Sequence, residues 1–130
     1  MVVAGTASDA HTWNLVFLEL YCGERGHDVV NLGPCVPPEL LVDECLRVRP
    51  RLVVISTVNG HGLVDGQRAV EALRARPELA DTPIVIGGKL TTGAAADTAA
   101  LLDAGATAVF ADGDLTGFDR FLADAEQVAS

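Results

Sequence analysis

The chain has 130 residues, a length that can form one domain with its own hydrophobic core and without disulfide or metal support. Apolar residues make up 49% of the sequence and aromatic residues only 5%, so the core must consist mainly of Val, Leu, Ile and Ala. The net charge of −9 argues against nucleic acid and anionic membranes as partners, because both are bound through Lys and Arg. We therefore expect a single domain over residues 1–130 that binds neither.

No apolar run approaches the roughly 18 residues that a membrane-spanning helix needs, and no basic signal-peptide region precedes the opening apolar residues. A cytoplasmic location is the resulting expectation. The cysteines Cys22, Cys35 and Cys45 are odd in number, lack C-x-x-C spacing, and each lies in or beside an apolar stretch. We expect buried, reduced thiols rather than metal ligands.

Along the chain, short runs of β-branched residues alternate with longer stretches that have helical spacing. Strands are expected at residues 1–5, 28–32, 52–56, 83–87 and 108–110. Helices are expected near residues 12–25, 38–48, 63–76, 94–104 and 116–128. This alternation predicts right-handed βαβ units. The expected fold class is therefore α/β, with a flavodoxin-like, doubly wound, five-stranded parallel sheet in the order 2-1-3-4-5 and helices on both faces.

Several helix ends carry their own signals. Pro37 and Pro38 open the second helix, where a missing N–H costs little, and Arg49-Pro50 ends it. Gly26 and Gly105 follow the first and fourth helices, at positions where glycine readily adopts the backbone conformation that terminates a helix.

In a doubly wound sheet, ligands bind beyond the carboxyl ends of the strands, beside strand one. The loop after that strand is long and polar, and in it Asp9 precedes His11 by two residues. Asp9 could accept a hydrogen bond from one ring nitrogen of His11, which leaves the other nitrogen free to bind a metal. The alternative is that Asp9 caps the following helix and that His11 is solvated in its first turn.

The loops after strands three and four combine hydroxyl groups with glycines. They read Ser56-Thr57-Val58-Asn59-Gly60-His61-Gly62 and Gly87-Gly88-Lys89-Leu90-Thr91-Thr92-Gly93. Such loops let a flat or elongated ligand approach the backbone closely, although capping of the next helix by Ser or Asn explains the first loop equally well. Three polar loops at one edge of one sheet indicate a ligand site.

These segments, in this order and spacing, resemble the cobalamin-binding domain of glutamate (methylaspartate) mutase, specifically its small subunit. They are Ser8-Asp9-Ala10-His11, residues 55–62 and residues 86–89, and the intervening segment 26–33 also looks alike. The resemblance runs over essentially the whole chain.

In that family an Asp-x-His-x-x-Gly motif supplies the histidine that displaces the cofactor's own dimethylbenzimidazole from cobalt, the base-off/His-on mode. The resemblance implies that His11 is the metal ligand and that Asp9 orients it. It also implies that Ser56, in a Ser-x-Leu-like element, hydrogen-bonds the displaced base in a slot between the sheet and its helices. The implied cofactor-binding residues are Ser8, Asp9, Ala10, His11, Thr12, Ser56, Thr57, Val58, Gly60, Gly87, Gly88, Lys89, Leu90, Thr91, Thr92 and Gly93.

One position departs from the motif. Asn14 stands where the family has glycine, and the bulky Trp13 precedes it. Since that glycine lies where the first helix begins near the slot, the Asn14 side chain could narrow the slot or simply cap the helix.

The resemblance implies a cytoplasmic isomerase subunit that binds adenosylcobalamin and is inactive alone. Its partner would be a larger TIM-barrel mutase subunit, in a heterotetramer of two small and two large chains. Two alternatives stay open: a corrinoid carrier or cobalamin-responsive interaction module without mutase activity, and a domain that has lost cobalamin and serves as a structural partner.

Two other functions of this fold are disfavoured. A phosphorylated receiver domain needs an aspartate at the end of strand three and a lysine after strand five, where this chain has Ser56 and Ala111-Asp112-Gly113. A flavodoxin usually stacks aromatic rings on its flavin, and aromatic residues are too few here.

Overall fold

We describe a computed structural model of the chain for residues 1–7, 12–57, 62–88, 94–111 and 117–123. Strands and helices alternate along it, as the spacing predicts. The strands are β1 (Val2–Gly5), β2 (Val30–Asn31), β3 (Val53–Thr57), β4 (Ile84–Gly88) and β5 (Ala108–Ala111). The helices are α1 (Trp13–Glu24), α2 (Pro38–Val48), α3 (Gly62–Arg74), the short 3-10 helix η1 (Pro77–Leu79) and α4 (Ala94–Ala104), and residues 117–123 are also helical.

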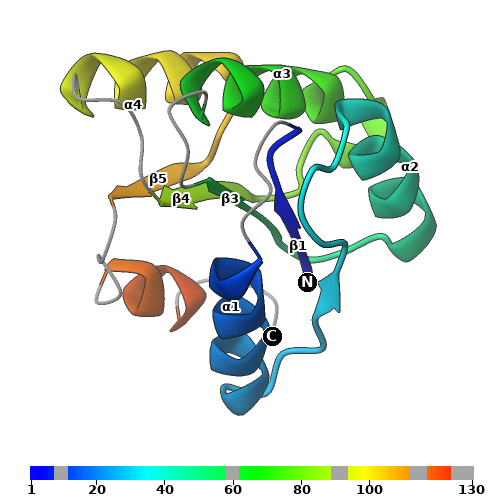
Figure 1. The fold of residues 1–130 in the computed structure, drawn as a ribbon. Coiled ribbons are helices and arrows are strands. Elements are labelled where there is room, and N and C mark those ends of the chain that lie inside the picture. The colour runs from blue at the N-terminus through cyan, green and yellow to red at the C-terminus, as the bar shows by residue number, and fades with distance from the viewer. Residues whose placement is uncertain (8–11, 58–61, 89–93, 112–116, 124–130) are drawn as a thin grey trace.

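The strands form one parallel sheet in the order β2-β1-β3-β4-β5, which confirms the predicted fold class. Figure 1 shows α2, α3 and α4 on one face of this sheet, and α1 with the helix at residues 117–123 on the other. Both faces are covered, so the strands can be apolar on both sides, as their near-continuous Val and Ile runs require.

Two hydrophobic clusters correspond to the two faces. Because side chains alternate along a strand, Val54 belongs to one cluster and its neighbour Ile55 to the other. The Ile55 cluster packs against α2, α3 and α4. The Val54 cluster includes Leu15 of α1 and Phe118 of the last described helix. Each helix layer is therefore held by its own set of buried apolar contacts.

Most predicted boundaries agree with the structure. Helices α2 and α4 span the predicted residues, and Gly26 and Gly105 have the positive φ angles of helix-terminating glycines, +88° and +123°. Arg49 ends α2 in the left-handed conformation, with φ 53°. The predicted second strand is too long, because only Val30–Asn31 pair with β1 at the edge of the sheet.

The cysteine prediction is confirmed for two residues and wrong for the third. Cys22 and Cys45 are buried, and this burial raises the pKa of each thiol to about 11. Cys35 is exposed, because it lies in the segment between β2 and α2, outside the strand and helix faces that form the core, with a positive φ of 53°. The described helices include none with the length and apolar character needed to cross a membrane.

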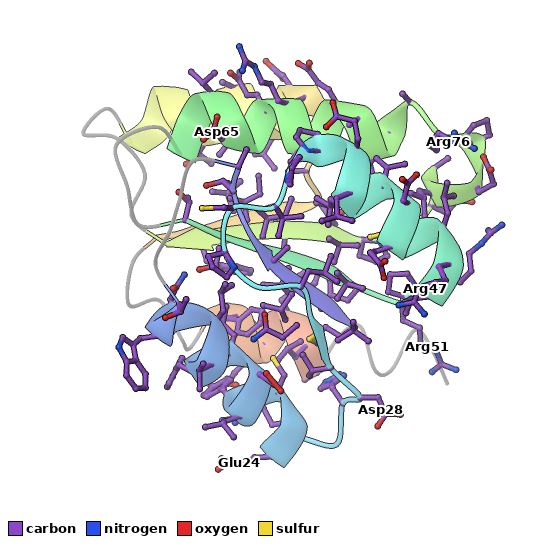
Figure 2. The ribbon with its side chains drawn as sticks, turned by 45° about the vertical axis from the view of Figure 1, so that its right-hand side comes forward. Glu24, Asp28, Arg47, Arg51, Asp65 and Arg76 are labelled. Atoms are coloured by element: carbon purple, nitrogen blue, oxygen red, sulfur yellow. The ribbon has the colours of Figure 1, made fainter. Side chains whose placement is uncertain are left out.

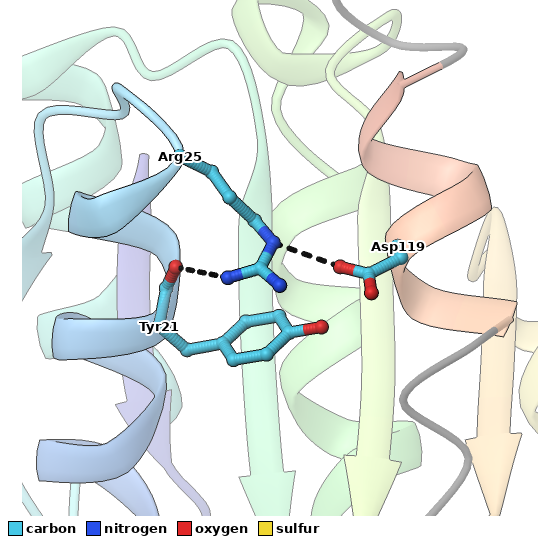
Figure 3. A network of polar contacts seen from close by, with 3 residues as sticks. All are labelled: Tyr21, Arg25 and Asp119. Carbon is cyan, nitrogen blue, oxygen red and sulfur yellow. Dashed lines mark hydrogen bonds and ion pairs between the residues drawn. The ribbon is translucent and has the colours of Figure 1, made fainter.

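A polar contact joins α1 to the helix at residues 117–123 (Figure 3). The Arg25 Nε group donates to Asp119 Oδ1 at 2.9 Å, and its Nη1 group donates to the Tyr21 carbonyl oxygen at 3.0 Å. The guanidinium carbon lies 3.5 Å from the centre of the Tyr21 ring, a cation–π contact. This contact fixes the carboxyl end of α1 relative to its neighbour on the same face.

Gly105 offers a test of the packing between α3 and the turn after α4. A Cβ atom there would lie 2.7 Å from Cγ of Arg74, whose guanidinium donates to the carbonyl oxygens of Gly105, Leu79 and Thr82. We expect Gly105→Ala to lower the free energy of unfolding by roughly 1–3 kcal/mol, because it adds backbone strain and displaces Arg74. Urea unfolding followed by circular dichroism measures this change.

Gly23 of α1 is the matched control, since a Cβ atom there would meet nothing within 4 Å. Gly23→Ala should stabilise the protein by about 0.5–1 kcal/mol, because alanine favours the helix. Equal effects of the two substitutions would contradict the proposed role of the Arg74 contact.

Candidate cofactor-binding site

The pairing of the strands brings the carboxyl ends of β1, β3 and β4, which the three predicted loops follow in the sequence, to one edge of the sheet. Gly5 of β1 is paired with Ser56 of β3, and Ser56 with Gly87 of β4. Ser56 and Gly87 lie in their strands, as the predicted ranges 52–56 and 83–87 imply, and the strands continue one residue further, to Thr57 and Gly88. We call the paired residues Gly5, Ser56 and Gly87 the carboxyl-edge row.

The carboxyl-edge row faces α1. Its residues lie two positions after Val3, Val54 and Val85, which belong to the cluster on the α1 face, and side chains two apart share a face. Ser56 is only 4% exposed and is the one side chain of the row that carries a polar group. The flanking glycines have no side chain, and a Cβ atom at Gly87 would meet only a backbone oxygen at 3.8 Å. A flat ring could therefore lie against bare backbone beside a single hydroxyl group.

Asn14 connects α1 to this row. Its Nδ2 group donates to Ser56 Oγ at 2.6 Å, across 42 residues of sequence. The cap position of α1 belongs to Thr12, so Asn14 is not the helix cap. Of the two possibilities raised by the departure from the motif, the structure supports a side chain that projects toward the predicted slot.

The second polar atom of the Asn14 amide is left without a partner. Within the described ranges, Oδ1 is buried and accepts no hydrogen bond. A buried carbonyl oxygen without a donor is costly, and such atoms in native structures call for a physical explanation. The carboxyl-edge row therefore has one hydroxyl group, Ser56, and the Asn14 side chain that contacts it from α1 carries one unsatisfied acceptor, Oδ1.

A second hydroxyl pair lies on the opposite face of the same edge. Thr6 Oγ1 donates to Thr57 Oγ1 at 3.3 Å, and the two residues are 2% and 0% exposed. Sequence reasoning included Thr57 in the site but not Thr6, whose position directly after β1 was the available signal. The side chains of Thr57 and Ser56 point to opposite faces, so only Ser56 faces α1.

Several predicted site residues lie outside the described part of the chain. They are Ser8, Asp9, Ala10, His11, Val58, Gly60, Lys89, Leu90, Thr91, Thr92 and Gly93. Of the other predicted residues, Thr12 is exposed at the start of α1. The described residues contain no group of three or more His, Cys, Asp or Glu side chains that could hold a metal ion.

Helix α1 also presents apolar side chains to solvent. Trp13 is 82% exposed, Phe17 47% and Leu20 64%, and this spacing places them on one side of the helix. Sequence reasoning singled out Trp13 alone, because the spacing of Phe17 and Leu20 is equally typical of a helix face turned to the core.

The fold defines the chain as a doubly wound α/β domain, and the carboxyl-edge row is a candidate ligand site at its switch point, between β1 and β3. The chain matches the family described as B12 binding domain over residues 1–117, and it belongs to that family. It is thus a cobalamin-binding domain. No curated protein matches the chain.

Solved structures show the same fold. A novel cobalamin-binding protein from Desulfitobacterium hafniense is 26% identical, with a TM-score of 0.71 over 83% of this chain and 50% of its own. The monomethylamine corrinoid protein of Methanosarcina barkeri is 20% identical, with a TM-score of 0.66 over 98% of this chain and 55% of its own. This chain thus spans about half the length of these two proteins. A response regulator from Burkholderia multivorans is 23% identical, with a TM-score of 0.61 over 94% and 93% of the chains.

The hydrogen bond between Asn14 and Ser56 can be measured through a double-mutant cycle. We expect Asn14→Ala and Ser56→Ala to be coupled by about 0.5–1.5 kcal/mol in the free energy of unfolding, because each removes the partner of the other. Urea unfolding of the two single variants and the double variant gives this coupling energy.

Thr107→Ala provides the control for this cycle. Thr107 Oγ1 accepts a hydrogen bond from the Ile84 N–H group at the opposite edge of the sheet. Its effect should add to that of Asn14→Ala to within about 0.5 kcal/mol. Additive effects of Asn14→Ala and Ser56→Ala would show that their bond does not form in solution.

Proposed function

We propose that this chain holds cobalamin base-off with His11 as the lower ligand of cobalt, as the small subunit of an adenosylcobalamin-dependent carbon-skeleton mutase of the glutamate to 3-methylaspartate type. The observation that carries the proposal is the carboxyl-edge row, with the buried Ser56 hydroxyl between two glycines under α1, in a chain of the B12-binding family.

The residues of the row suit the nucleotide tail of cobalamin. The tail ends in a flat aromatic base with one ring nitrogen that accepts hydrogen bonds. Ser56 carries a hydroxyl group that can both accept from Asn14 and donate to a ring nitrogen. Gly5 and Gly87 leave the backbone open to close approach on either side of that hydroxyl.

The proposed cobalt ligand belongs to the segment that joins β1 to α1. This segment connects Ala7 to Thr12 at the same edge of the sheet as the row. In the proposal, His11 binds cobalt through one ring nitrogen, and Asp9 accepts a hydrogen bond from the other, which fixes the tautomer and raises the basicity of the ring. When bound, adenosylcobalamin supplies a weak cobalt–carbon bond whose homolysis initiates radical rearrangement.

Substrate binding requires a second chain. Figure 2 shows Arg47, Arg51 and Arg76 on the side of the molecule opposite Asp65, which lies near the start of α3, so these three cations lie away from the carboxyl ends of the strands. The net charge of −9 would repel a dicarboxylic amino acid. In the proposal, a larger TIM-barrel subunit holds the substrate and contacts Trp13 and the other exposed apolar residues of α1, in a heterotetramer of two small and two large chains.

One observation favours a second candidate function. The solved structures that resemble the chain include a cobalamin-binding protein and a monomethylamine corrinoid protein, and the chain covers only about half of each. A corrinoid carrier or cobalamin-responsive module would use the same tail-binding residues without radical chemistry. The two functions differ in whether a mutase partner is required.

Cobalt ligation by His11 can be tested by electron paramagnetic resonance of the Co(II) form. With ¹⁵N-labelled histidine in the protein, the nitrogen splitting should change if a histidine binds cobalt. We expect His11→Ala to remove this labelled splitting and His27→Ala, at a histidine outside the proposed site, to preserve it. A histidine splitting that persists in His11→Ala would exclude His11 as the ligand.

The subunit proposal can be tested through activity. Adenosylcobalamin-dependent interconversion of glutamate and 3-methylaspartate should be absent with this chain alone and should appear when a candidate large subunit is added. Turnover by the isolated chain would contradict the subunit proposal. Firm cobalamin binding without association to a barrel subunit would instead support the carrier.

A further inference from the structure

The Asn14 side chain has a polar atom that the protein itself does not satisfy. Its Nδ2 group donates to Ser56 Oγ at 2.6 Å, whereas Oδ1 is buried and, within the described ranges, has no hydrogen-bond partner. Water cannot compensate an atom that is removed from solvent, so its solvation is lost without replacement. A ligand that brings a hydrogen-bond donor to this atom would recover that lost free energy.

Asn14 is positioned to meet such a ligand. It reaches from the first turn of α1 to Ser56, the central residue of the carboxyl-edge row, whose two neighbours are glycines. A flat base that lies along the row beside Ser56 must therefore either contact the Asn14 amide or displace it. The glycine that the family has at this position carries no side chain, so a bound base there has no amide group to contact or displace.

We propose that Asn14 selects corrinoids by their lower base, favouring a base with an N–H donor, such as adenine, over dimethylbenzimidazole. This inference rests on the proposed entry of the nucleotide tail beside Ser56. Dimethylbenzimidazole has a ring nitrogen that accepts and two methyl groups, so it leaves Asn14 Oδ1 unsatisfied. Adenine has an amino donor next to a ring acceptor, which is the pattern that an asparagine amide pairs with through two hydrogen bonds.

A purely structural role would use only one of the two polar atoms of the Asn14 amide. If Asn14 only held α1 to β3, the bond to Ser56 would suffice, and a buried acceptor without a partner would serve no purpose. The same amide that is unsatisfied in the free protein would also make the slot less suitable for an apolar base, because a desolvated carbonyl oxygen beside methyl groups has no compensating contact. The selectivity therefore has two sources: Asn14 Oδ1 gains a hydrogen bond from an adenine-type base, and it remains without a donor beside dimethylbenzimidazole.

The test compares three corrinoids by calorimetric titration: cobalamin, the analogue with adenine as its lower base, and cobinamide, which has no base. Adenine leaves cobalt more readily than dimethylbenzimidazole, so the preference of wild type alone is not informative. The comparison with Asn14→Gly removes this intrinsic difference, because it applies to both proteins. We expect the preference for the adenine analogue to fall by about tenfold in Asn14→Gly, the size of one hydrogen bond to a buried group.

Two controls accompany this measurement. Cobinamide should bind wild type and Asn14→Gly equally, because it has no base to contact Asn14. Thr107→Ala should keep the wild-type preference, since Thr107 Oγ1 accepts a hydrogen bond from the Ile84 N–H group at the start of β4, away from the carboxyl-edge row.

The outcomes separate the inference from the proposed function. An unchanged preference in Asn14→Gly, or an equal effect of this substitution on cobinamide, would overturn base selection while leaving cobalamin binding intact. Failure of wild type to bind any of the three corrinoids would overturn the proposed function itself.

Discussion

The parallel register of β1, β3 and β4 is the constraint on which the candidate site depends. It places Gly5, Ser56 and Gly87 side by side, and the alternation of side chains turns all three toward α1. A shift of one residue in β3 would bring Thr57 to this face and remove Ser56 from it. The buried Val and Ile residues on both faces of the central strands prevent such a shift, because it would exchange the contents of the two hydrophobic clusters.

Helix α1 has a polar contact near each of its ends. Near its start, Asn14 bonds to Ser56, and near its end Arg25 joins Tyr21 to Asp119. Leu15 and Cys22 fill the space between these contacts. Asn14 thus has two roles in the proposal. Its side chain ties α1 to β3, and it contacts the lower base of a corrinoid bound beside this helix. The outer side of α1 remains apolar and exposed, which suits a partner chain.

The fold alone does not decide between the functions that share it. A response regulator and corrinoid proteins match this chain with similar TM-scores, so the sheet order carries no functional information by itself. The residues at the carboxyl edge do differ between these classes. A phosphorylated receiver needs a carboxylate where this chain has Ser56, whereas a small hydroxyl group between glycines suits a flat, uncharged base.

The sequence by itself determined the element order and the parallel sheet, because strands and helices each leave an apolar spacing that repeats within a few residues. It also determined the helix-ending glycines Gly26 and Gly105, because glycine readily adopts the positive φ angle that ends a helix. It also singled out Ser56 and the unusual Asn14. Only the tertiary structure decided that these two residues are bonded, that Cys35 is exposed, and that Phe17 and Leu20 face solvent. Contacts across 42 residues depend on strand register and on how α1 lies across the sheet, and no local spacing in the chain encodes either of them.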